Sequence, residues 1–86
     1  MSHQGMIEVT DELTTAVQAV VECFEPYRAE HRPDRMETER WLILNNKTYE
    51  RLGVIQLAGA KEQSLSILEK KVLLRTRAMD LLRDVA

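Results

Sequence analysis

The last third of the chain is a long run without glycine or proline. Neither residue occurs between residues 60 and 84, where Leu, Glu, Lys and Arg dominate. All four are strong helix formers. The segment therefore predicts one helix of roughly 25 residues, or about 38 Å at 1.5 Å per residue. Such a helix is longer than the ~30 Å diameter of a small domain, so it limits how the remaining residues can fold around it.

Apolar residues cover more than half of the circumference of this predicted helix. With residues placed 100° apart, they form two stripes. The first stripe contains Leu65, Leu68, Val72, Met79 and Leu82, and the second contains Ile67, Leu74, Ala78, Leu81 and Val85. A helix that covers a single core needs a stripe of only roughly 100°. Either each stripe packs on one of the chain's own helices, or one stripe faces a second molecule.

The length of the predicted helix favours the second interpretation. A first helix of about 16 residues covers only ~24 Å, which leaves the end from Leu74 to Val85 exposed. Burying one large aliphatic side chain is worth about 1.5–3 kcal/mol. Association with a protein partner would recover this free energy. We therefore expect a protein interface at Leu74, Leu81 and Val85, with Leu73 at its margin.

A first helix is predicted to begin at Thr10, a good N-cap residue. Asp11 and Glu12 follow at the positive end of the helix dipole. The apolar seam contains Leu13, Val17, Val20, Phe24 and Tyr27. Pro26 ends or kinks the helix near residue 25, and residues 1–9 are expected to be a flexible leader.

A second helix is predicted for residues 35–52. Asp34 and Glu37 resemble a capping box at its start, and Gly53 or Gly59 is a suitable residue to end it. Trp41 lies in its seam and is expected to fill the core, whereas Asn45 either fixes register or faces solvent. The preceding residues, 28–33, are interpreted as a polar linker.

These elements predict an all-α fold with a single helical domain at residues 10–86. Helices one and two form an antiparallel hairpin, the long C-terminal helix packs across it, and copies associate as a coiled-coil type bundle. Residues 1–33 carry six acidic and two basic side chains, and residues 60–86 carry four acidic and six basic ones. The first and last helices are therefore complementary in charge.

The composition excludes several classes of function. The net charge of −2 argues against a strongly basic nucleic-acid binder, and the absence of an apolar run near 18 residues argues against a membrane span. One cysteine cannot form an internal disulfide and fits a reducing, cytoplasmic compartment. His3 and His31 lack metal-ligand spacing, so no metal, cofactor or small-molecule ligand is expected.

No residue pattern indicates catalysis. Cys23 lies near the predicted C-terminal end of a helix, where the dipole opposes a thiolate, and is interpreted as a buried small hydrophobic residue. The sequence also lacks paired carboxylates within an apolar stripe. We therefore expect a protein that is not an enzyme.

The function that best fits these features is a small helical protein-interaction module. It would be a homodimer or a subunit of a larger complex, acting as an accessory or regulatory protein such as a phage-type inhibitor or an assembly chaperone. The alternative is a DNA-binding regulator of the helix–turn–helix type. Its candidate nucleic-acid contacts are Arg40, Lys47, Arg51, Lys70 and Lys71.

Overall fold

The middle of the chain folds into a sheet rather than a helix. The computed structural model describes residues 2–85, with side chains from Val9 onward. Its elements are α1 (Ser2–Val21), β1 (Tyr27–His31), β2 (Arg40–Asn45), β3 (Arg51–Gln56), α2 (Gly59–Gln63) and α3 (Ile67–Arg83). The prediction of an all-α, coiled-coil bundle is therefore wrong, because three antiparallel strands in the order β1-β2-β3 make the fold α+β.

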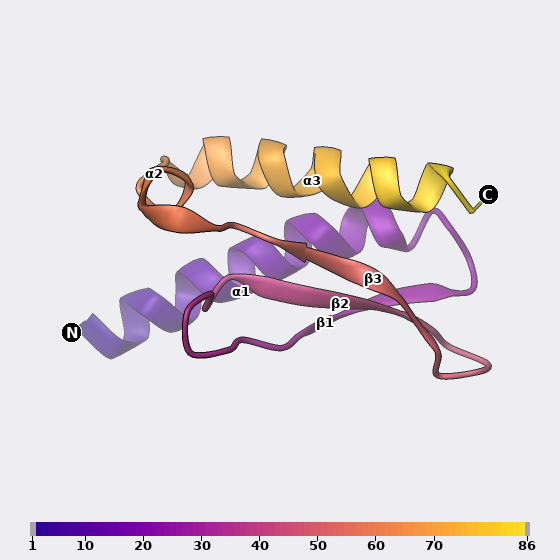
Figure 1. The fold of residues 1–86 in the computed structure, drawn as a ribbon. Coiled ribbons are helices and arrows are strands. Elements are labelled where there is room, and N and C mark those ends of the chain that lie inside the picture. The colour runs from indigo at the N-terminus through magenta and orange to yellow at the C-terminus, as the bar shows by residue number, and fades with distance from the viewer. Residues whose placement is uncertain (1, 86) are drawn as a thin grey trace.

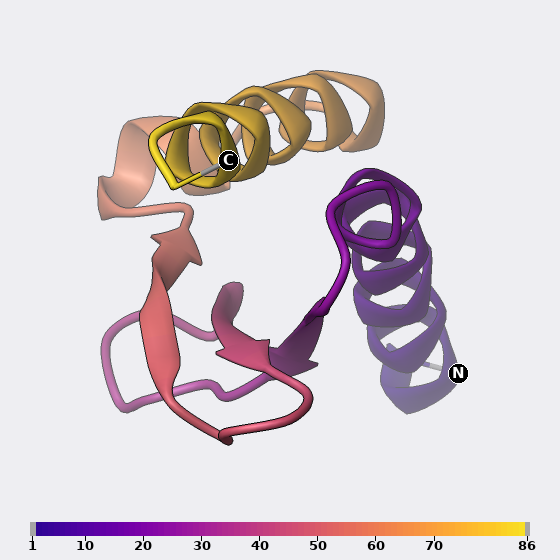
Figure 2. The same cartoon turned by 90° about the vertical axis from the view of Figure 1, so that its right-hand side faces the viewer.

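The two long helices cover one face of this sheet. Figure 1 shows α1 and α3 on the same side of the strands, and Figure 2 shows α1 beside β1 and α3 above β3. The core between the layers contains Leu13, Val17, Val21, Ala29, Trp41, Ile43, Ile55, Leu57, Leu74, Ala78 and Leu82. Because α3 returns alongside β3, its C-terminal half lies next to an edge strand (Figure 1).

The first helix begins earlier than the sequence predicts. Helix α1 starts at Ser2, so Thr10 lies inside the helix and does not cap it. The predicted seam is confirmed at Leu13 and Val17, which are completely buried. The helix ends at Val21, and a turn with a cis Glu25–Pro26 bond leads into β1.

Strand β1 occupies most of the segment interpreted as a polar linker. Ala29 is buried while its neighbours are only half-buried, as expected for a strand with one face on the core. Asp34 does accept a hydrogen bond from the Glu37 N–H at 2.7 Å, but also one from the Met36 N–H at 2.9 Å. These bonds shape the loop between β1 and β2, and no helix follows them.

Strands β2 and β3 replace the predicted second helix. Trp41 and Ile43 alternate with half-buried Leu42 along β2, which is the period-two pattern of a half-covered strand. Asn45 then makes the turn, since its side-chain oxygen accepts hydrogen bonds from the Lys47 and Thr48 N–H groups. A helix–turn–helix needs a reader helix in this segment, and the described residues form none there.

The predicted 25-residue C-terminal helix is interrupted. Helix α2 ends at Gln63 and α3 starts at Ile67, where Ser66 and Glu69 form a reciprocal capping box. Helix α3 has 17 residues, or about 26 Å at 1.5 Å per residue. It does not extend past the domain, so the length argument for an exposed end fails.

Candidate functional site

Helix α3 packs on the core through one line of residues four apart. Lys70, Leu74, Ala78 and Leu82 are its buried residues, and they lie one above another because residues i and i+4 share a helix face. Leu74, Ala78 and Leu82 pack in the core shared with the sheet and α1. The stripe containing Leu74 and Ala78 is thus used inside the molecule.

The four residues predicted as a protein interface do not form one exposed surface. Leu74 is completely buried, and Leu73 and Leu81 are half-buried against the core. Val85, beyond the end of α3, is 48% exposed. In this fold Leu74 is therefore covered by the chain itself.

Apolar surface remains on the side of α3 turned away from the sheet. Leu68 is 71% exposed and Val72 is 54% exposed, and half-buried Met79 continues the line two turns later. We call these three residues the outer strip. A shallow hollow of about 320 Å³ lies along it and is lined by Val72, Arg75, Thr76, Met79, Asp80 and Arg83. Three members of the first apolar stripe, Leu68, Val72 and Met79, thus supply this exposed surface, whereas Leu82 of the same stripe is buried.

A second hollow lies between β3 and the C-terminal half of α3. It has a volume of about 470 Å³, and we call it the β3 groove. Its lining comprises Val54, Ile55, Gln56, Ala58, Glu62, Arg77, Asp80, Leu81 and Asp84. Leu81 closes tightly on the strand here, because a Cβ atom placed on Gly53 would lie 2.9 Å from both Leu81 Cδ atoms. Only glycine allows this approach without a shift of Leu81.

Arg77 holds one end of the β3 groove in place. Its guanidinium donates to both Glu62 carboxylate oxygens, at 2.7 and 2.6 Å, and to the Gln56 carbonyl at 2.7 Å. The Arg77 hydrogen bonds, joined by the Ala58 N–H, lower the pKa of Glu62 to about 2. In turn, the Glu62 carboxylate raises the pKa of Arg77. This pair ties α2, β3 and α3 together.

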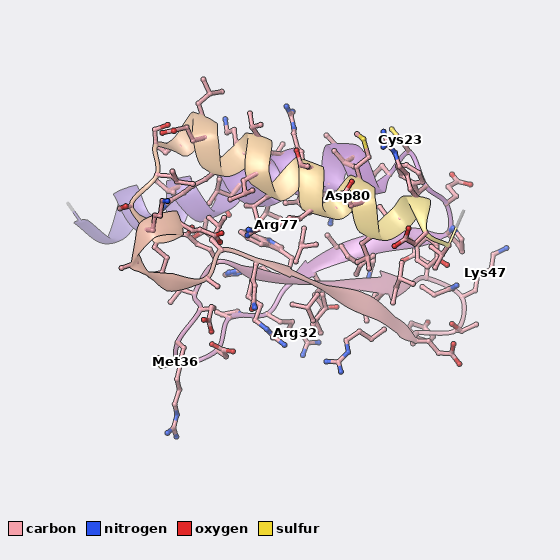
Figure 3. The ribbon with its side chains drawn as sticks, turned by 45° about the horizontal axis from the view of Figure 1, so that its top comes forward. Cys23, Arg32, Met36, Lys47, Arg77 and Asp80 are labelled. Atoms are coloured by element: carbon pink, nitrogen blue, oxygen red, sulfur yellow. The ribbon has the colours of Figure 1, made fainter. Side chains whose placement is uncertain are left out.

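The five candidate nucleic-acid contacts lie on different parts of the molecule. Lys70 is buried, with Nζ 3.1 Å from Glu39 Oε1, and Lys71 Nζ is 3.9 Å from Glu12 Oε2 on α1. Arg40 lies near Asp34 at the β1–β2 loop, whereas Lys47 is exposed beyond the opposite end of β2 (Figure 3). Arg51, the first residue of β3, is also exposed. The fold therefore does not gather them into one basic surface.

The other residues considered in the sequence are Trp41, Cys23 and His31. Trp41 is completely buried, which confirms its predicted place in the core, and its Nε1–H donates to Thr14 Oγ1 at 2.9 Å. Cys23 is exposed rather than buried. His31 is in a strand rather than a solvated linker, and its ring lies 5.2 Å from that of Trp41.

Among residues with described positions, no group of three or more His, Cys, Asp or Glu side chains is placed to hold a metal ion. Within the same residues, no helix is long and apolar enough to cross a membrane. Comparisons with protein-family models, curated proteins and solved structures find no match to this chain.

Proposed function

We propose that this chain is a protein-interaction module that pairs with a second copy through the outer strip of α3. The observation that carries this function is the exposure of Leu68 and Val72, one helical turn apart, on a helix whose opposite side is fully packed. Burial of such side chains is worth about 1.5–3 kcal/mol each. The module acts by binding rather than by catalysis, in the manner of an accessory or regulatory protein.

The charges at the two ends of α3 favour a second copy as the partner. Glu69 lies in the first turn and Arg83 in the last turn. When two α3 helices pack antiparallel about Thr76, Glu69 meets Arg83 of the second copy, because both lie seven residues from Thr76. Position 72 then lies opposite position 80 of the second copy, so Val72 and the second copy's Met79 are offset by one residue, or about 1.5 Å along the helix axis. The apolar contact is thus flanked on each side by an ion pair between Glu69 of one copy and Arg83 of the other.

The exposed thiol of Cys23 supports a cytoplasmic location for such a module. Free cysteines are kept reduced in the cytosol, whereas oxidising compartments favour disulfides.

The dimer is tested by measuring solution mass with light scattering across a concentration series. Wild-type protein is expected to approach the mass of two chains as its concentration rises. Val72→Glu buries a charge in the interface and is expected to remain at the mass of one chain with an unchanged circular dichroism spectrum. The matched control is Met36→Glu, which changes a 79% exposed residue on the loop between β1 and β2.

The control protein is expected to dimerise like the wild type. A wild-type protein that keeps the mass of one chain at every concentration would contradict the dimer. A Val72→Glu protein that still dimerises would move the interface away from the outer strip.

A further inference from the structure

One edge of the sheet is closed by a side chain. On β1, the Gln18 side chain from α1 donates through Nε2 to the Ala29 carbonyl at 2.6 Å and accepts the Ala29 N–H through Oε1 at 3.3 Å. A side-chain amide has one donor and one acceptor side, so it satisfies both backbone groups as a neighbouring strand would. Open strand edges bind other strands unless they are blocked in some such way.

The β3 edge differs from β1 at its centre. Leu57 N–H donates to the Glu39 carbonyl, and Ile55 pairs with Trp41. In an antiparallel ladder alternate residues bond to the same neighbour, so Val54 and Gln56 direct their N–H and C=O groups away from β2. Arg77 binds the Gln56 carbonyl. Both backbone groups of Val54 and the N–H of Gln56 point into the β3 groove without a hydrogen-bond partner among the described residues.

The wall of the groove opposite this edge is acidic. Asp80 and Asp84 line it, and both are exposed. Six ion pairs form among the described residues, and neither aspartate takes part in one. Figure 3 shows Asp80 further along α3 from Arg77, which reaches toward β3. A segment bound in the groove would meet two unpaired carboxylates.

The spacing of these carboxylates matches that of a strand. Asp80 and Asp84 are four residues apart on α3, or about 6 Å along the helix axis. Side chains two residues apart on a strand are separated by about 6.6 Å and share a face. A residue paired with Val54 would share the outer face of the sheet with Val54 and Leu42. Its two neighbours would point the other way, toward α3 and its two aspartates.

We propose that the β3 groove binds an extended peptide segment that adds to β3 as a fourth strand and carries a basic–apolar–basic triplet. The apolar residue pairs with Val54, and the two basic side chains meet Asp80 and Asp84. Arg77, fixed by Glu62, ends the pairing at Gln56. The open edge of β3 lies outside the outer strip, and Asp80 is the one lining residue that the two hollows share.

The test uses ¹⁵N-labelled full-length protein titrated with the acetylated and amidated peptide Thr-Lys-Val-Lys-Thr. The Val54 and Gln56 amide signals are expected to shift, and their hydrogen exchange to slow. A Thr-Glu-Val-Glu-Thr peptide is expected to bind at least about tenfold more weakly, because its charges oppose the aspartates. A Thr-Lys-Val-Lys-Thr peptide with an N-methylated valine lacks the donor for the Val54 carbonyl and is expected not to shift Val54.

Protein variants test the acidic wall. Asp80→Asn/Asp84→Asn should weaken binding of the lysine peptide about 2- to 30-fold, the range for two exposed ion pairs of 0.2–1 kcal/mol each. Asp11→Asn removes an exposed carboxylate from α1 instead, and should leave binding unchanged.

Four results would overturn the assignment of this site. One is the absence of any shift at millimolar lysine peptide, and another is equal binding of the lysine and glutamate peptides. A third is undiminished binding of the N-methylated peptide. The last is protection of the Val54 amide in concentrated protein without peptide, which would show that β3 pairs with a second copy instead.

Discussion

At the scale of single residues, Lys70 is a charged side chain placed in the interior. Its ammonium group lies 3.1 Å from Glu39 Oε1, and Glu39 Oε2 is buried without a hydrogen-bond partner. Removing one partner of a buried ion pair leaves the other charge uncompensated and costs about 3–5 kcal/mol. Lys70→Met should therefore lower the free energy of unfolding by that amount in urea denaturation.

The double variant Lys70→Met/Glu39→Met should recover most of the loss, because an apolar pair of similar volume often replaces a buried ion pair without cost. An unchanged urea midpoint for Lys70→Met would contradict this prediction. It would mean that solvent, rather than Lys70, compensates the charge of the Glu39 carboxylate.

At the scale of elements, the contact between α1 and the edge of β1 depends on Gln18. Its side-chain amide hydrogen-bonds both backbone groups of the buried residue Ala29, and without Gln18 these groups are left unpaired. An unsatisfied buried group costs about 1–3 kcal/mol, so Gln18→Ala should destabilise the protein within that range. Hydrogen exchange at the Ala29 amide should accelerate in this variant.

The matched change is Gln63→Ala, whose side chain makes only a 3.5 Å contact with the Met36 carbonyl. It should have little effect on stability. Equal losses for the two variants would mean that Gln18 does not close the edge of β1.

At the scale of the whole molecule, self-association should make stability depend on concentration. Helices and sheet share one core, so unfolding one chain removes α3 from any dimer. A partner that binds only the folded state stabilises it by mass action. If a dimer unfolds to two chains, each tenfold rise in protein concentration adds about 1.4 kcal/mol per mole of dimer.

The thermal midpoint of wild-type protein and of Met36→Glu should therefore rise with concentration, as measured by calorimetry. The midpoint of Val72→Glu should stay constant. A wild-type thermal midpoint that does not change with protein concentration would contradict the proposed dimer.

Helical segments with a strong apolar period were predictable from their residues. The seam through Leu13 and Val17 is buried as expected, and residues 67–83 are helical. The break before α3 also had a local signal, since Ser66 and Glu69 have the spacing of a capping box. The local sequence signal for the strands was weaker. The run Trp41-Leu42-Ile43-Leu44 is apolar at every position, so it fits a buried helix as well as a strand.

Local sequence therefore predicted where apolar side chains cluster and where α3 forms, because helix hydrogen bonds join residues four apart. It did not predict β1, β2 and β3, because a strand is stabilised by a partner distant along the chain. The exposed side of α3 depends on the same pairing. Leu74 became core and Leu68 surface because the sheet, assembled from residues 27–56, lies against one side of that helix and leaves the other uncovered.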